Sequence, residues 1–131
     1  MSLLKNIKVQ YLLVFLVAVL QYANTANHDY AWDDAIVITE NERVKKGLSD
    51  IPELFENIKS DETANRYGYR PISLLSFATD IEVFGLDSKA GHKVSILLYG
   101  LLCMLIFYFL NTFFPQNRWG NLFVATLFAV H

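Results

Sequence analysis

The sequence predicts an all-α membrane protein, with two transmembrane helices, a truncated third and a helical loop between the first two. Hydrophobic residues make up 53% of the 131 residues, more than in a typical soluble domain. Residues 9–28 and 94–117 contain no charged side chain. All 13 acidic residues lie between Asp29 and Asp87. This segregation indicates two membrane helices that flank an aqueous loop.

The first apolar segment, Val9–Ala26, follows a short basic leader that contains Lys5 and Lys8. Counted from Ile7, it reaches the ~20 residues that a membrane helix needs. A secretory signal peptide has the same basic start and apolar centre. Asn24 would occupy the −3 position of a cut after Ala26, which disfavours cleavage. We therefore expect residues 1–26 to form an N-terminal tail and an uncleaved first transmembrane helix.

The region 27–93 is predicted to be a loop with amphipathic helices. It is too rich in large apolar residues for a disordered linker. Asp50 and Glu53 have the spacing of a capping box for a helix from Ile51. Pro71 is expected to open another helix that ends near Gly85. The apolar face of that helix fits either the bilayer interface or a small extramembrane domain.

The secondary structure of one short stretch of this loop stays open, and the last part of the loop is predicted to consist of turns. Ala35–Thr39 is rich in β-branched residues, which leaves helix and strand open. Residues 85–93 contain two glycines and are expected to form a turn-rich connector.

The second transmembrane helix is predicted over 94–114, which is long enough to cross a bilayer. It contains Cys103, the single cysteine, so no disulfide is possible within the chain. Residues 115–131 are expected to form a cytoplasmic turn and a truncated third transmembrane helix that stops at His131.

Basic residues near the helix ends predict the orientation. Lys5, Lys8 and Arg118 would share one side of the membrane, opposite the acidic loop. The positive-inside rule places them in the cytoplasm and the loop 27–93 outside it. The formal net charge of −2 argues against a nucleic-acid partner, which would require a basic surface.

Asp33 and Asp34 are the first candidates for chemistry. One interpretation is a helix N-terminus, where carboxylates are favoured. The other is a catalytic base that takes a proton from an attacking hydroxyl group. The second carboxylate would then orient the acceptor or hold a divalent cation, the one candidate cofactor. Trp32 beside them suits the membrane interface.

Arg70 is the second candidate. It stands where a helix begins, a position at which the helix dipole does not favour a cation. Its guanidinium suits a phosphate group, and the alternative is a surface ion pair. His28, His92 and His131 lack the spacing of metal ligands, so no metal site is predicted from them. His131 ends an apolar run, where an ionisable residue is a functional candidate.

Four short motifs occur in order along the chain: Asp33-Asp34, Tyr69-Arg70-Pro71-Ile72, Gly85-Leu86-Asp87 leading to His92, and Phe128-Ala129-Val130-His131. In this order and spacing, the segment from Tyr30 to His131 resembles the N-terminal part of the membrane O-mannosyltransferases that carry tetratricopeptide repeats. It also resembles their bacterial relatives in the GT-C class of glycosyltransferases.

The resemblance implies an inverting enzyme that moves a sugar from a polyprenyl-phosphate donor to a hydroxyl acceptor on a protein or glycan. It places the catalytic base at Asp33 or Asp34 and assigns the donor phosphate to Arg70. The family usually has His, two residues and Asn, with a second histidine further on. Here His92 fits, whereas Ser95 and Tyr99 depart from that pattern. Further candidates for the substrate site are Trp32, Tyr69, His92 and His131.

Two functions follow. The first is a fragment of a membrane glycosyltransferase that is inactive alone, because a lipid-donor site needs walls from further helices. The alternative is a small non-enzymatic protein with two membrane helices, whose outer loop binds a partner. Membrane lipids surround the chain in both.

Overall fold

The computed structural model describes residues 5–55 and 70–131. Every element within those two ranges is helical, which confirms the all-α prediction. Two helical segments, Ile7–Asn27 and Ser88–Phe113, are long and apolar enough to cross a membrane. The chain is therefore an all-α membrane protein, and it divides into two compact units. The bundle unit comprises residues 1–26 and 92–131, and the loop unit comprises residues 27–91.

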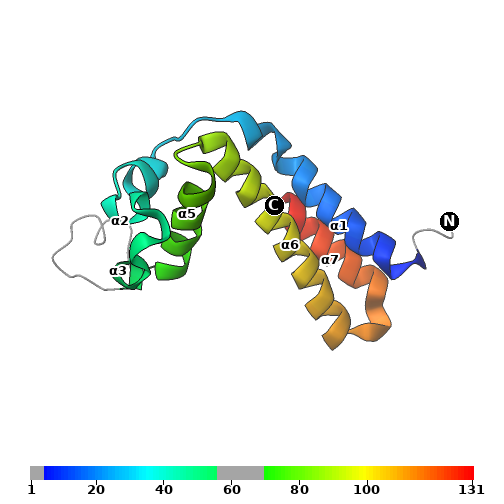
Figure 1. Cartoon of the computed structure of the whole chain (residues 1–131). Helices are drawn as coiled ribbons and strands as arrows, with labels where there is room; N and C mark the ends of the chain where they lie inside the picture. Colours follow the sequence, from blue (N-terminus) through cyan, green and yellow to red (C-terminus); the bar gives the residue numbers. More distant parts are fainter. Residues whose placement is uncertain (1–4, 56–69) are drawn as a thin grey trace. The chain divides into compact units, whose positions relative to one another are not determined.

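Three helices form the bundle unit, side by side in Figure 1. They are α1 (Ile7–Tyr22), α6 (Ser88–Phe113) and α7 (Arg118–Val130). A 3₁₀ turn, η2 (Ala23–Asn27), extends α1. Helix α1 begins where Asn6 accepts a hydrogen bond from the N–H of Lys8 at 3.0 Å. This side-chain cap satisfies one of the N–H groups that the first turn leaves without an intrahelical partner.

Helix α6 begins at Ser88 rather than at Val94. The carboxylate of Asp87 accepts hydrogen bonds from the N–H groups of Lys89 (2.9 Å) and Ala90 (3.3 Å). Asp87 thus acts as an N-cap and allows the helix to start before the apolar run. The prediction of a turn-rich connector over 85–93 is wrong for residues 88–93.

The core of the bundle unit combines large and very small side chains. Its buried members are Val14, Ala18, Cys103, Phe107, Leu122, Ala125 and Ala129. Gly100 of α6 lies against the side chains of Phe15 and Val19 on α1. A Cβ atom at Gly100 would stand 2.7 Å from Cε2 of Phe15 and 3.2 Å from Cγ2 of Val19. A side chain at this position would therefore force the Phe15 ring to move.

We expect Gly100→Ala to be less stable than Gly91→Ala by about 1–3 kcal/mol, the usual cost of overpacking. Both substitutions gain the same helix propensity, but a Cβ at Gly91 meets no atom within 4 Å. The measurement is reversible SDS unfolding in mixed micelles, followed by circular dichroism. Equal stabilities of the two variants would show that α1 and α6 do not pack closely at Gly100.

Hydrogen bonds of Arg118 join α7 to α1 and to the residue Lys5 before it, at the end of the bundle where α1 begins. Nε of Arg118 donates to Oε1 of the fully buried Gln10 at 2.6 Å, and Nη2 donates to the carbonyl of Lys5 at 2.6 Å. Lys5 and Arg118 therefore lie at the same end of the bundle, as the basic pattern of the sequence required.

The loop unit consists of short helices around one longer helix, α5 (Pro71–Phe84). The short elements are a π-helix, η3 (Ala35–Thr39), α2 (Glu42–Lys45), a 3₁₀ turn, η4 (Gly47–Asp50), and α3 (Ile51–Phe55). The ambiguous stretch Ala35–Thr39 is thus helical. Pro71 opens α5, and Gly85 follows its last residue with φ of 70°, so the predicted bounds of this helix are confirmed.

The apolar face of α5 packs within the loop unit. Its buried Leu74 and Ala78 join a core with Val37, Ile38, Val44 and Leu54. Of the two alternatives for this face, the structure supports packing on an extramembrane domain. Glu53, the predicted capping residue, pairs with Nζ of Lys46 at 2.6 Å, and helix α3 begins at Ile51 as predicted.

Candidate functional site

The two predicted carboxylates, Asp33 and Asp34, lie in a tight turn at the start of a helical segment. The N–H of Asp34 donates to the carbonyl of Ala31 at 2.9 Å. In return, Oδ2 of Asp34 accepts the N–H of Ala31 at 3.0 Å. This reciprocal pair has the geometry of a capping box, in which a side chain reaches back to the N-terminal N–H. Of the two interpretations of this pair, a carboxylate that stabilises a helix N-terminus therefore describes Asp34 well.

Asp33 occupies a different environment from its neighbour. Its side chain is exposed, and no hydrogen bond or ion pair involves its carboxylate within the two ranges that the structure describes. Trp32 before it has φ of 39° and is 94% exposed. A positive φ is uncommon for a bulky residue, and the indole side chain of Trp32 lies in solvent. An exposed carboxylate of this kind can reach a hydroxyl group supplied by a ligand.

Tyr30 lies near several carboxylates of the loop unit. Burial is the largest cause that raises the pKa of its phenol, and the carboxylates of Asp34, Asp87 and Asp80 raise the pKa further. Tyr30 also packs against the core of this unit. Among the described residues, no cluster of three or more His, Cys, Asp or Glu side chains could hold a metal ion. The acidic residues around Tyr30 therefore form a negative surface without the geometry of a metal site.

Asp80 was not among the predicted site residues, although it lies on the polar side of α5. Burial raises the pKa of its carboxyl group. Perturbed acids are common at functional sites, but the sequence shows only an acid in an amphipathic helix. Its burial depends on how α5 packs in the folded unit.

We expect Asp80→Asn to raise the melting temperature at pH 7 and to leave it unchanged near pH 3. Because the folded-state pKa is raised, the stability from this group is complete below the unfolded pKa of ~3.9. It is lost as the pH rises through the folded pKa, and asparagine has no such loss. Thermal unfolding followed by circular dichroism measures this, with the exposed Asp29→Asn as control. The same pH dependence in native and Asp80→Asn chains would contradict a buried Asp80.

Arg70 lies at the N-cap position of α5, and its side chain is exposed. Its carbonyl accepts the N–H of Leu74 at 3.1 Å, so its backbone starts the helix. Tyr69, the neighbouring candidate, lies outside the described residues. Asp33, Asp34 and Arg70 thus belong to the loop unit, whereas His92 and His131 belong to the bundle unit.

His92 lines a cavity of about 260 Å³ in the bundle unit. The other lining residues are Tyr22, Thr25, Ser95, Ile96 and Tyr99. Three of these residues occupy the positions of the family motif: His92, Ser95 and Tyr99. Their spacing of i, i+3 and i+7 places them on one face of α6. Nε2 of His92 is buried and has no hydrogen-bond partner among the described residues.

Tyr99 connects two of the motifs that lie far apart in the sequence. Its hydroxyl group donates to the carbonyl of Phe128 at 2.9 Å, and its ring contacts that of Tyr22 edge-on, with centroids 5.1 Å apart. The motif at 128–131 therefore meets the motif that begins at His92. His131 itself is exposed and lines a separate cavity on α7, of about 470 Å³.

Curated proteins provide the decisive comparison. The chain is 28% identical over 115 residues to Protein O-mannosyl-transferase TMTC1 of Mus musculus. It is 29% identical over 114 residues to Protein O-mannosyl-transferase Tmtc1 of Drosophila melanogaster and 28% identical over 114 residues to TMTC1 of Homo sapiens. The predicted resemblance is confirmed. Each match covers 84% of this chain but only 12–13% of the relative.

The chain thus spans about an eighth of the length of these TMTC-type relatives. No protein-family model matches it, and no solved structure matches it significantly.

Proposed function

We propose that the chain supplies the catalytic-base loop and flanking helices of a membrane glycosyltransferase. The sugar donor is a polyprenyl-phosphate sugar, and the acceptor is a hydroxyl group on a protein or glycan. The observation that carries this proposal is the similarity to three protein O-mannosyl-transferases over 84% of the chain. The 131 residues alone are proposed to be inactive, because they correspond to 12–13% of those proteins.

Asp33 is the proposed base. Its exposed carboxylate takes the proton of the acceptor hydroxyl as that oxygen attacks the anomeric carbon. The bond between that carbon and the phosphate oxygen breaks, and the phosphate leaves with the bonding electrons. A single displacement of this kind inverts the anomeric centre. Asp34 is proposed to position Asp33, because its own carboxylate is engaged by the N–H of Ala31 at 3.0 Å.

Arg70 is proposed to bind the donor phosphate. Its guanidinium is exposed at the N-terminus of α5, where the N–H groups of a helix favour an anion. A guanidinium can bind two phosphate oxygens at once. Charge that accumulates on the leaving phosphate would thereby be stabilised.

The test is transfer of a radiolabelled sugar from a polyprenyl-phosphate donor to hydroxyl-bearing peptides. The assay uses membranes from cells that express the complete reading frame of the protein, with membranes from non-expressing cells as control. Transfer that depends on the protein supports the proposal. Absence of transfer, together with specific capture of a protein by the loop unit, would instead favour the partner-binding scaffold.

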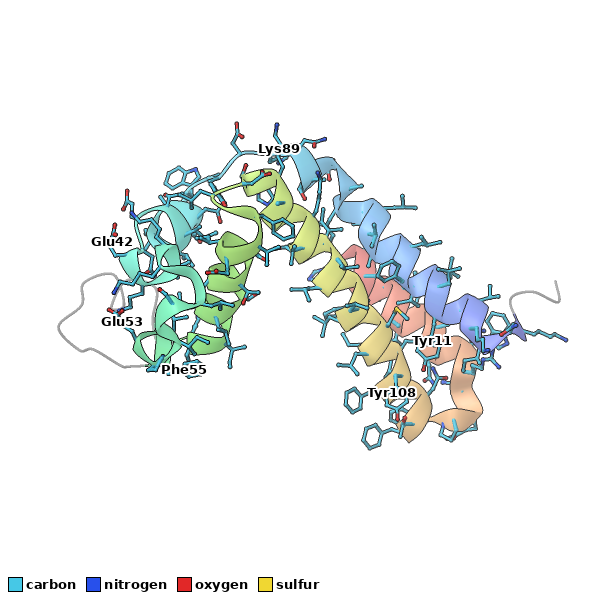
Figure 2. The ribbon with its side chains drawn as sticks, in the orientation of Figure 1. Tyr11, Glu42, Glu53, Phe55, Lys89 and Tyr108 are labelled. Atoms are coloured by element: carbon cyan, nitrogen blue, oxygen red, sulfur yellow. The ribbon has the colours of Figure 1, made fainter. Side chains whose placement is uncertain are left out.

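The proposed topology places the loop unit outside the cytoplasm. We expect Glu42→Cys to react with a membrane-impermeant thiol reagent in intact cells, because the Glu42 side chain is 79% exposed on the loop unit (Figure 2). Its ion pair with Lys45 lies on the surface, so the substitution should cost little stability.

Two controls accompany this labelling. Native Cys103 is fully buried and should stay unlabelled. A cysteine at the exposed Asn117 should react only after the cells are permeabilised, because it lies beside Arg118 at the proposed cytoplasmic end. The reverse labelling of the two positions would overturn the orientation.

A further inference from the structure

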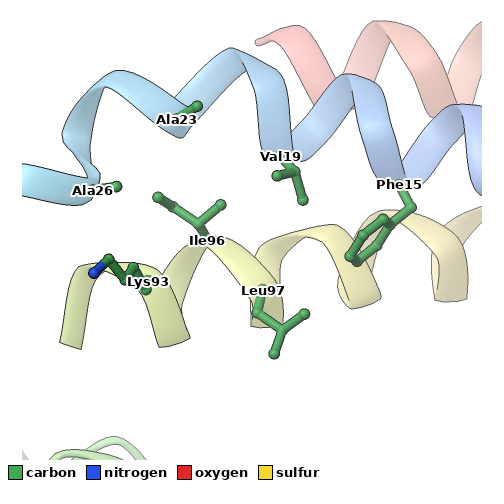
Figure 3. Close-up of a pocket in the computed structure, with 7 residues that line it drawn as sticks. All are labelled: Phe15, Val19, Ala23, Ala26, Lys93, Ile96 and Leu97. Atoms are coloured by element: carbon green, nitrogen blue, oxygen red, sulfur yellow. The ribbon is translucent and has the colours of Figure 1, made fainter. Parts of the chain in front are cut away.

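A second cavity of about 260 Å³ lies between α1 and α6 in the bundle unit (Figure 3). Phe15, Val19, Ala23 and Ala26 line it from the first membrane segment, and Lys93, Ile96 and Leu97 line it from α6. The walls are apolar except for Lys93. None of these seven residues belongs to the proposed base or phosphate site.

The shape of this cavity follows from the packing of the two helices. At Gly100 the helices are in close contact through Phe15 and Val19. Toward Ala26 and Lys93, small side chains on the first segment leave space, into which Ile96 points (Figure 3). The result is a groove that begins near Lys93 and closes at Phe15. Its lining residues on the first segment run from Phe15 to Ala26, a length of about 16 Å at 1.5 Å per residue.

The size and the walls of the groove fit one hydrocarbon chain. Its volume of about 260 Å³ is slightly below the 300–1,000 Å³ of sites for drug-sized ligands. Leu97, one of its lining residues, is 50% exposed, so the groove is open to the hydrocarbon that surrounds a membrane helix. A length of about 16 Å matches the ~15 Å thickness of one leaflet.

Lys93 determines which lipid fits best. Its ammonium group stands in the first turns of α6, where the helix dipole adds positive potential. No acidic residue is among the lining residues. Lys93 is exposed, so a lipid with an anionic headgroup can pair its phosphate with this ammonium group.

We propose that the groove between α1 and α6 binds one acyl chain of an anionic bilayer phospholipid, with the lipid phosphate at Lys93. The acyl chain lies along Val19, Ile96 and Leu97 and ends near Phe15. The headgroup stays at the membrane surface beside Ala26. This inference does not depend on the proposed glycosyl transfer, because it uses none of the residues assigned to that reaction.

The test is native mass spectrometry of the protein in neutral detergent, titrated with phosphatidylglycerol or with phosphatidylcholine of the same chains. Native protein should prefer phosphatidylglycerol, and Lys93→Gln should weaken that binding about fivefold, the effect of one lysine at an anionic surface. The matched control is Lys89→Gln, because Lys89 is exposed on the first turn of α6 and does not line the groove (Figure 2). Its binding should equal that of the native protein.

A second variant tests the groove itself. Ala23 is exposed and lines the groove, so Ala23→Leu should fill it without disturbing the fold and should weaken binding of both lipids. Unchanged binding in Ala23→Leu would overturn the proposal, as would equal losses in the two lysine variants. Tight binding of a polyprenyl phosphate without binding of phosphatidylglycerol would overturn it too, because the groove would then serve a different lipid.

Discussion

Asp33→Asn is expected to lower the rate of glycosyl transfer about 10²–10⁴-fold, the usual contribution of a positioned general base. Asparagine keeps the shape of the side chain but cannot accept the hydroxyl proton. The carboxylate is exposed and has no partner within the described residues, so the substitution breaks no hydrogen bond of the fold. The loss should therefore appear in kcat, with normal expression and normal thermal stability.

Two matched variants separate catalysis from structure. Asp34→Asn removes a carboxylate that accepts the Ala31 N–H at 3.0 Å, so it should weaken the turn and lower activity less than Asp33→Asn. Asp29→Asn removes an exposed acid from the same segment and should leave transfer unchanged. The measurement is initial rate against acceptor concentration in membranes that contain the complete protein. Full activity in Asp33→Asn would exclude this residue as the base.

The existence of the membrane helices could be predicted because their signal is local. Long uncharged apolar runs are sufficient, since every backbone group of a membrane helix is satisfied within the helix. The start of α6 could not be predicted from hydropathy, because residues 88–93 are mostly polar or small. The information lay instead in Asp87, whose side chain caps the N–H groups of Lys89 and Ala90.

Elements of the loop unit depended more on tertiary packing. Local preference left Ala35–Thr39 undecided, and burial of Val37 and Ile38 in the core accompanies its helical form. Similarly, the sequence indicated two adjacent acids but could not distinguish them. The distinction rests on a hydrogen bond from Ala31 to Asp34, formed in a turn in which Trp32 has a positive φ.

The cavity lined by His92, Ser95 and Tyr99 could likewise be predicted only in part. Helical periodicity places His92, Ser95 and Tyr99 on one face of α6. It gives no reason for Tyr99 to bond with the carbonyl of Phe128 at 2.9 Å. That contact joins residues of two helices and depends on how α7 returns along α1 and α6.

One buried amide joins α7 to the end of α6, and Asn121→Leu is expected to destabilise the bundle by about 1–3 kcal/mol. Asn121 is 3% exposed. Its Nδ2 donates to the carbonyls of Phe114 (2.8 Å) and Leu110 (3.2 Å) and to Oδ1 of Asn111 (3.2 Å). The carbonyl of Leu110 also accepts the N–H of Phe114 at 2.8 Å, and the carbonyl of Phe114 accepts the N–H of Asn117 at 3.1 Å. Asn121 therefore adds a second hydrogen bond to each of these carbonyls.

Leucine has the same number and branching of side-chain non-hydrogen atoms as asparagine, so the substitution mainly removes these donors. Each lost hydrogen bond costs about 0.5–1.5 kcal/mol, and apolar burial of leucine offsets part of the sum. The matched control is Asn117→Leu, since Asn117 is exposed in the same connection and its side chain caps nothing. Reversible SDS unfolding in mixed micelles should place Asn121→Leu well below both native chain and control. If Asn121→Leu is instead as stable as the control, α7 is held without this amide, by its apolar contacts with Val14, Ala18 and Phe107 and by the hydrogen bonds of Arg118 and Tyr99.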